Sequence, residues 1–350
     1  MPPKKGKGSA IDPDDPSMNP EAVVDNYKKY CKLAALAPHP KVLAQLGGDE
    51  EQLEVMMKNE QLVVDGEPIL GPHGTRALCT ALMGNAPGMS GAVFKMCKNF
   101  RFWRMDCSDD GAACLAEILR LGGAELPMAY LEMLDCGVGY RGAHALGQSL
   151  MCGQNRSLLT LKLDYNSSLG SDGCRALCQG LRTNATLKQL HLCYCGLDEE
   201  AGKPLGEVLS YAKTTLQKLH LQGNKMRGGG LSGILSGMDN NNKLEYLSLA
   251  DNAIAATDED LEALEQLAGV MQRETSLLSQ VDLLHNRIGE KGANTMLAAF
   301  NGGELEGSKG PPGKVQMLTV DNSLPDQLFN TLGRLDAGKG GKGKKGKKKK

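Results

Sequence analysis

The chain has 350 residues, of which 41% are apolar and only 4% aromatic, so leucine and small residues must fill any core. The formal net charge of −1 hides an asymmetry, because eight lysines lie in the last thirteen residues while the rest of the chain has an acidic excess. No run of about 18 apolar residues occurs, which argues against a membrane span. The eleven cysteines show neither a C-x-x-C motif nor zinc-ligand spacing, and no leader-like segment is found, a combination typical of free thiols in a reducing, cytoplasmic compartment.

The N-terminal part of the chain differs in character from the rest. Residues 1–20 are rich in proline, lysine and glycine and are predicted to be disordered. Residues 21–98 are predicted to form a helical cap and then a partial repeat, with Leu62 in a strand and Leu78 and Leu82 in a helix. A cap is expected because the first turn of a stacked array would otherwise expose its apolar interior.

Residues 99–335 repeat themselves with a period of about 29 residues. The pattern L-x-x-L-x-L-x-x-N/C-x-L is clearest at Leu187–Leu197 and recurs from Leu216 and from Leu244. Each repeat continues with apolar residues four apart, such as Leu177 and Leu181, which make one helical stripe. The ninth position of the pattern is always asparagine or cysteine, and its members are Cys107, Cys136, Asn166, Cys195, Asn224, Asn252 and Asn286.

This pattern resembles the ribonuclease-inhibitor-like subfamily of leucine-rich repeats over roughly residues 100–325. The resemblance implies an α/β solenoid, a horseshoe with a parallel inner sheet and outer helices, in which the Asn and Cys side chains form a buried ladder. Unpaired amides in a buried turn are costly, and short polar side chains can satisfy them. The RGGG run at 227–230 is interpreted as turn residues. So are the glycines ahead of the helical stripes, Gly111, Gly142, Gly173 and Gly292.

The fifth position of the repeats holds His191 and His220 in succession. Equivalent positions on neighbouring parallel strands lie about 4.8 Å apart, so the two rings are expected to stack on the concave face within a weakly basic patch. We interpret the patch as a partner-contact site, with a merely solvated face as an equal alternative; a metal site would need a third ligand, which is not found. Acidic residues are expected on the same surface at Glu132, Asp135, Asp164, Asp251, Asp282 and Asp321. The predicted contact residues are Lys162, Tyr165, His191, Tyr194, His220 and Tyr246.

Residues 336–350 form a Lys/Gly tail that is predicted to be disordered. Flexible positive charge attracts polyanions, so the tail is expected to contact an anionic surface such as a microtubule, with a solubilising role as an equal alternative. The tail has no aromatic residues, so sequence-specific nucleic-acid binding is not expected. The tail residues predicted to make this contact are Lys344, Lys345, Lys347, Lys348, Lys349 and Lys350.

A rigid repeat array with a long inner face predicts a non-catalytic scaffold that binds a protein partner. No catalytic motif or cofactor-binding sequence is present to suggest an enzyme. The Lys/Gly-rich ends are similar to those of axonemal proteins, which implies a cytoskeletal or ciliary scaffold. The alternative is a GTPase-activating protein of the Ran GTPase-activating type, which shares these repeats and would use an arginine on a loop rim. The candidate arginines are Arg141, Arg175 and Arg287, although no catalytic segment of that family can be matched.

Overall fold

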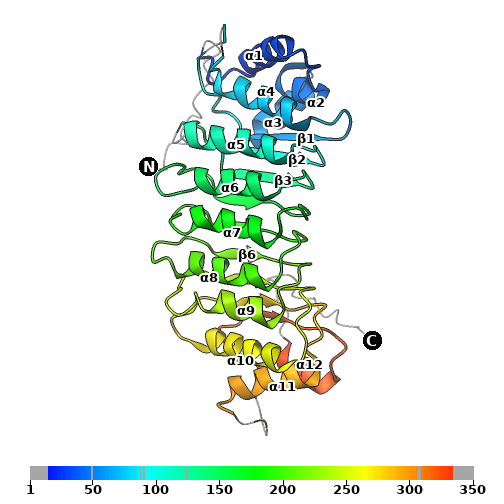
Figure 1. Ribbon diagram of the computed structural model, residues 1–350, viewed down its shortest axis with the longest axis vertical. Helices are drawn as coiled ribbons and strands as arrows, with labels where there is room; N and C mark the ends of the chain where they lie inside the picture. Colours follow the sequence, from blue (N-terminus) through cyan, green and yellow to red (C-terminus); the bar gives the residue numbers. More distant parts are fainter. Residues whose placement is uncertain are drawn as a thin grey trace, which may run out of the picture.

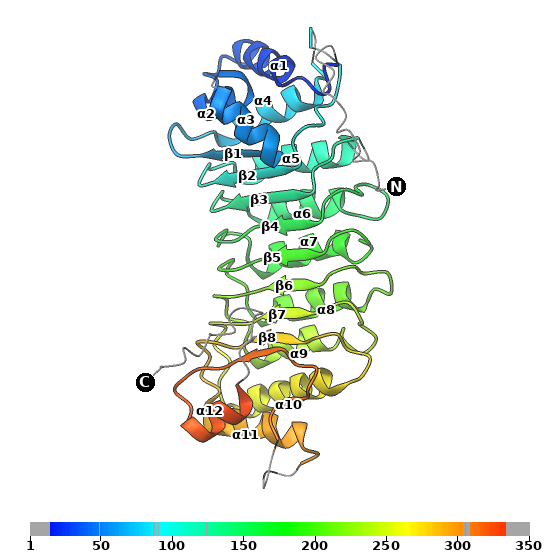
Figure 2. The same cartoon turned by 180° about the vertical axis from the view of Figure 1, so that it is seen from behind.

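The computed structural model describes residues 15–48, 50–86, 88–89, 91–122, 125–303, 305 and 309–333. Within these ranges nine strands form one parallel sheet, and each strand pairs with the next one along the chain. The helices of the repeats lie on one side of the sheet and leave the other side open (Figures 1 and 2). The predicted parallel sheet with outer helices is confirmed. Most of the N-terminal segment and all of the Lys/Gly tail lie outside the described residues.

The N-terminal edge of the sheet is covered by helices. They are α1 (Pro20–Leu33), α2 (Pro40–Leu43), the π-helix η1 (Ala44–Gly48) and α3 (Glu50–Asn59). The side-chain amide of Gln45 in η1 donates to the carbonyl of Val63 and accepts from its N–H at 3.0 Å. An edge strand with free amides invites unwanted pairing, and Gln45 satisfies these groups as a further strand would.

The repeats begin with β1 (Gln61–Asp65) and α4 (Gly71–Met83), so the first strand–helix unit precedes the clear sequence pattern. The later strands are β2 (Asn99–Trp103), β3 (Tyr130–Leu134), β4 (Thr160–Lys162), β5 (Gln189–His191), β6 (Lys218–His220), β7 (Tyr246–Ser248), β8 (Gln280–Asp282) and β9 (Met317–Thr319). The later helices are α5 (Ser108–Gly122), α6 (Tyr140–Ser149), α7 (Gly170–Leu181), the short 3-10 helix η2 (Glu199–Ala201), α8 (Gly202–Ser210), α9 (Arg227–Leu235), α10 (Asp258–Gln272), α11 (Gly289–Phe300) and α12 (Asp326–Leu332). None of the helices in the described ranges is long and apolar enough to cross a membrane.

The leucines of the pattern share one continuous interior between the sheet and the helices. In β5 the buried Leu190 lies between the half-buried Gln189 and His191, so alternate side chains face the core and the open side. Neighbouring strands lie about 4.8 Å apart, whereas packed helices lie about 8–10 Å apart. The stack therefore bends with the strands on its inner side, which makes the open sheet surface the concave face.

The ninth positions point into this interior, and Asn224 shows what they do there. Its side-chain oxygen accepts from the N–H groups of Cys195 at 3.1 Å and Leu197 at 3.0 Å. Its amide nitrogen donates to the carbonyls of Leu192 at 2.9 Å and Leu221 at 2.7 Å. One side chain thus ties two repeats together through backbone groups that, apart from the Leu221 carbonyl, would otherwise be buried unpaired. The Asn and Cys residues of the series are all at most 5% exposed. The placement of Cys107 in the series was wrong, because the register of β2 with β3 aligns Met105 with Cys136 and Cys107 with Val138.

A second asparagine series supports the turns that lead from the helices into the strands. Asn184 donates to the carbonyl of Leu150 in the preceding repeat at 2.7 Å and accepts from the N–H of Leu187 at 2.7 Å. Asn155 and Asn241 make the same pair of contacts in their own repeats. Sequence reasoning missed this series, although each member stands three residues before the first leucine of a pattern.

The glycines interpreted as turn residues lie inside helices instead. Gly111, Gly142, Gly173 and Gly292 fall within the early turns of α5, α6, α7 and α11, and residues 227–230 open α9. Close packing explains them better than turn formation. A Cβ at Gly142 would lie 2.9 Å from the Cβ of Ala112. A Cβ at Gly228 would lie 2.7 Å from the Cα of Asp260 in α10. The turn interpretation was wrong because the composition of a glycine run does not distinguish turn conformation from helix contact.

Candidate functional site

A row of three neighbouring rings, two of them stacked, runs across the middle of the concave face. His191 and His220 are paired in register on β5 and β6. Their ring centroids lie 3.8 Å apart with an interplanar angle of 9°, and the ring of Tyr246 on β7 lies 4.6 Å from that of His220. The imidazoles are therefore closer than the strand spacing, because they tilt into face-to-face contact. We call His191, His220 and Tyr246 the ring row.

Burial keeps the imidazoles of the ring row neutral. Burial, with a contribution from His220 and from the lysines at 162 and 218, lowers the pKa of His191 to about 3. Burial and the same two lysines lower the pKa of His220 to about 4. The positive charge of this weakly basic patch therefore comes from Lys162 and Lys218, while the imidazoles are uncharged at neutral pH.

The chain should lose stability as the pH falls from 7 to 4. Both imidazoles have folded-state pKa values well below that of an unfolded histidine, so protonation favours the unfolded chain. Their stabilising contribution is complete above about pH 6.5 and is lost as the pH falls towards the folded values. The urea midpoint should therefore decrease with acidification. The variant His191→Phe, which keeps a ring but cannot titrate, should show a smaller decrease; an unchanged slope would contradict this assignment.

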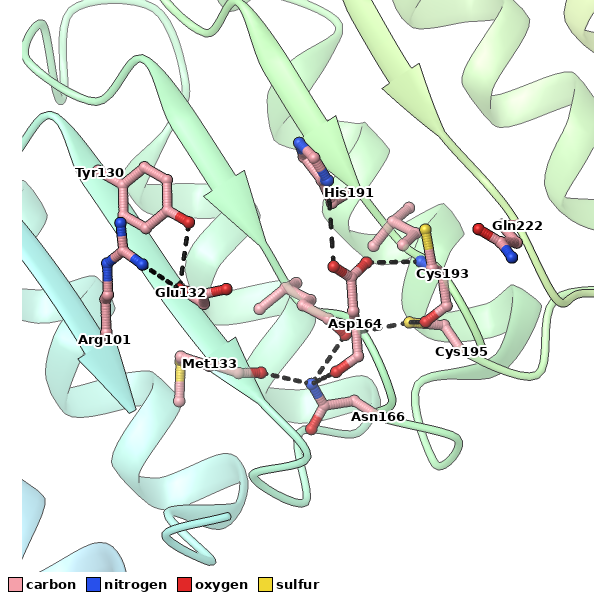
Figure 3. A network of polar contacts seen from close by, with 12 residues as sticks. Arg101, Tyr130, Glu132, Met133, Asp164, Asn166, His191, Cys193, Cys195 and Gln222 are labelled. Atoms are coloured by element: carbon pink, nitrogen blue, oxygen red, sulfur yellow. Dashed lines mark hydrogen bonds and ion pairs between the residues drawn. The ribbon is translucent and has the colours of Figure 1, made fainter. Parts of the chain in front are cut away.

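The concave face continues from the ring row towards the N-terminus as a second cluster (Figure 3). The guanidinium of Arg101 lies 4.8 Å from the ring centroid of Tyr130, and the ammonium of Lys162 lies 5.6 Å from it. Glu132, only 7% exposed, accepts from the Tyr130 hydroxyl at 3.1 Å and pairs with Arg101 at 3.7 Å. Cations on a tyrosine ring and a paired buried carboxylate hold one another in place. Sequence reasoning missed Arg101 and Tyr130.

Asp164 follows β4 and contacts the next repeat at the end of β5 (Figure 3). One oxygen accepts from the N–H of Cys193 at 2.7 Å, and the other lies 4.0 Å from Nδ1 of His191. Burial, reinforced by Asp164, raises the pKa of the Cys193 thiol to about 12, so this thiol is protonated and unreactive. Among the described residues no group of three or more His, Cys, Asp or Glu side chains is arranged to hold a metal ion.

Tyr165 and Tyr194 lie on the rim where the strands end, outside the ring row. Their rings are stacked at 4.9 Å with an interplanar angle of 7°, and Gln222 donates to the Tyr194 hydroxyl at 3.3 Å. Both have positive φ, 64° and 55°. A left-handed backbone costs a non-glycine residue about 1–2 kcal/mol. We call this pair the tyrosine ledge.

The predicted contact residues thus divide between two places. Lys162, His191, His220 and Tyr246 lie on the strands, whereas the tyrosine ledge lies on the rim. Of the arginines considered for a GTPase-activating role, Arg175 is held by Asp172 at 2.6 Å and Glu200 at 2.8 Å on the helical side. The tail lysines at positions 344–350 lie outside the described residues.

Comparison with known proteins agrees with this architecture. A family model described as Leucine Rich repeat matches residues 154–178, 212–235 and 240–264. The ribonuclease inhibitor of Mus musculus is 30% identical over 181 residues, which cover 50% of this chain and 37% of the inhibitor. The NACHT, LRR and PYD domains-containing protein 14 of Mus musculus is 24% identical over 270 residues, covering 62% of this chain and 26% of that protein. The chain thus spans little more than a third of the first relative and about a quarter of the second.

Solved structures with a similar chain path include leiomodin-1 actin-binding site 2. It has a TM-score of 0.35 and 15% sequence identity, over 41% of this chain and 78% of that one. A likeness this distant carries no argument about function. The repeat pattern, the nine-stranded parallel sheet in the described ranges and the ribonuclease inhibitor match are what classify the molecule. The chain is a leucine-rich-repeat protein of the ribonuclease-inhibitor-like type.

Proposed function

We propose that this chain is a non-catalytic scaffold whose concave face binds a protein partner. The ring row carries the proposal. His191 and His220 are stacked in register on neighbouring strands, and the ring of Tyr246, which pairs in register with Lys218, leans against His220 at an interplanar angle of 34°. Little conformational entropy therefore remains to be lost when a partner covers these rings. The imidazoles are neutral, so covering them removes no charge from water.

The surroundings of the ring row also support a protein contact. Nε2 of His191 is buried and has no hydrogen-bond partner among the described residues. A hydrogen-bonding group on a partner would satisfy it. The cluster of Arg101, Tyr130 and Glu132 continues the surface towards the N-terminus with charges of both signs already paired. A polar partner surface of mixed charge would match this arrangement.

The proposal includes a second contact through the Lys/Gly tail. Eight lysines in residues 339–350 would attract an anionic surface, and a tethered second contact raises the effective concentration of the first. A microtubule or another cytoskeletal surface, in a cilium or elsewhere in the cytoplasm, is the surface that the composition favours. This part of the proposal rests on composition alone.

Site-specific photo-crosslinking in the native cell tests the concave-face contact. A photoreactive phenylalanine analogue is placed at Lys218, which lies on β6 beside the ring row. The matched control carries it at Gln179, an exposed position on α7 on the helical side. We expect a discrete crosslinked product from position 218 and none from position 179.

The same experiment separates the two contacts. A chain that lacks residues 336–350 should keep the crosslink from position 218, in lower yield if the tail raises the local concentration of the partner. Equal products from both positions, or a product from position 179 alone, would overturn the concave-face proposal. The variant with His191→Ala and His220→Ala should lose most of the product while keeping its repeat fold, which far-ultraviolet circular dichroism checks.

A further inference from the structure

We infer that the tyrosine ledge and Asp135 together bind an arginine side chain of the partner protein. The inference rests on the proposed function and adds a defined anchor point to it. It concerns the rim at the ends of β3, β4 and β5, a surface separate from the ring row.

The eighth position of the repeats places the three side chains in one line. The N–H of Asp135 donates to the carbonyl of Asp164 at 3.1 Å, and that of Tyr165 donates to the carbonyl of Cys193 at 2.8 Å. The N–H of Tyr194 continues the series to the carbonyl of Gln222 at 2.8 Å. Each residue is therefore one strand spacing from the next, about 4.8 Å. Asp135 stands beside Tyr165 on the side away from Tyr194.

The residue types along this line indicate a role beyond folding. All of these positions have positive φ, and Asp135, Gly223 and Asp251 are types that tolerate it well. Tyrosine is unfavourable in this backbone conformation. The side chain of Tyr165 is 52% exposed, so its burial does not offset the conformational cost. A strained, exposed aromatic residue is a reasonable sign of a binding function.

The ledge is closed at one end and open at the other. At the closed end the ring of Tyr194 lies against Gly223, where a Cβ would come within 2.1 Å of its Cε1 atom. At the open end Tyr165 stacks only on Tyr194 among the described residues. Asp135 lies between Tyr165 and Arg104, whose N–H continues the series to the carbonyl of Leu134 at 2.9 Å, and no ion pair joins Asp135 to a cation in these ranges. An aromatic face next to an unpaired carboxylate remains available to a partner.

A guanidinium fits this pair better than any other side-chain group. It is planar and can stack on the ring of Tyr165 while its N–H groups point to the carboxylate of Asp135. An ammonium can interact with the same two groups but cannot stack or bind in a bidentate manner. The ledge should therefore prefer arginine to lysine.

A random peptide library displayed on phage and panned against the full-length chain tests this preference. We expect the selected peptides to be enriched in arginine. Replacing that arginine by lysine in a synthetic peptide should weaken binding, measured by titration calorimetry, several-fold. The variants Tyr165→Ala and Asp135→Asn should each weaken the arginine peptide roughly five- to tenfold, whereas Tyr165→Phe should bind nearly as well as the original chain.

Asp251→Asn is the matched control, because it removes the same charge from the same position of another repeat. Its neighbours in the line are Gly223 and the exposed imidazole of His285, so it has no stacked pair of tyrosine rings beside it. Equal losses for Asp135→Asn and Asp251→Asn would show bulk electrostatics and overturn the inference, as would a selection without arginine enrichment. If either of these results is obtained while the crosslink from position 218 persists, the proposed concave-face contact is retained and only the arginine site at the tyrosine ledge is rejected. The urea midpoints of all variants exclude unfolding as the cause of a loss.

Discussion

Replacing Gly180 by alanine should destabilise the chain by about 3 kcal/mol or more. A Cβ at this position in α7 would lie 1.8 Å from the carbonyl oxygen of Gly147 in α6. Both groups belong to helix backbones, so no change of side-chain rotamer can relieve the overlap and one helix must move away from the other. Urea-induced unfolding, followed by circular dichroism, measures the effect.

The control is Gly269→Ala in α10. A Cβ there would meet nothing within 4 Å, so the substitution changes only the backbone entropy. It should stabilise the chain by roughly 0.5–1 kcal/mol. Opposite signs for the two substitutions would support the packing explanation. A loss of less than about 1 kcal/mol for Gly180→Ala would contradict the close contact between α6 and α7.

Replacing Asn224 by leucine should cost about 4 kcal/mol or more, given about 1–3 kcal/mol for each buried polar group left unpaired. The variant leaves the N–H groups of Cys195 and Leu197 and the carbonyl of Leu192 without a partner, while the carbonyl of Leu221 keeps the side-chain amide of Asn252 at 2.9 Å. The similar size of leucine limits any cavity contribution. Urea unfolding again gives the free-energy difference.

The variant Asn224→Cys separates lost hydrogen bonds from lost volume. Cysteine already occupies this position in the preceding repeat, where the Cys195 thiol donates to the carbonyl of Leu163 at 3.1 Å. A thiol at 224 could serve one carbonyl but could not accept from both N–H groups as the amide oxygen does. Its cost should therefore fall between zero and that of Asn224→Leu. A cysteine variant that is less stable than the leucine variant would contradict the ladder's proposed role.

The repeat period alone predicted much of the fold. A stack of strand–helix units is the arrangement that both buries the regularly spaced leucines and pairs the Asn and Cys side chains with backbone groups. It also predicted that His191 and His220 would meet, since equal positions on parallel strands are neighbours. Arg101 and Tyr130 escaped notice. In their repeats phenylalanine and methionine replace leucines of the pattern, so the concave positions were harder to align.

Other features depend on three-dimensional surroundings that no local pattern records. The neutrality of His191 results from burial beneath its neighbours, and the stack of Tyr194 on Gly223 results from the backbone conformation of the rim. The glycines of the helices were misread for the same reason. Each of these glycines is required by the atoms of a neighbouring repeat that pack against it, and the sequence around the glycine does not show those atoms.

These glycines also affect the breadth of the binding surface. Gly180 meets the backbone of Gly147, and Gly237, just after α9, would bring a Cβ within 1.9 Å of the carbonyl oxygen of Gly206 in α8. Helices that touch through their backbones lie nearer to each other than helices separated by side chains, so the outer layer is shorter at the α6–α7 and α8–α9 contacts than it would otherwise be. A shorter helical layer differs less in length from the sheet, so the sheet needs to curve less. The sheet is therefore less curved at these repeats than side chains between the helices would make it, which suits the broad side of a folded protein better than a narrow, strongly convex one.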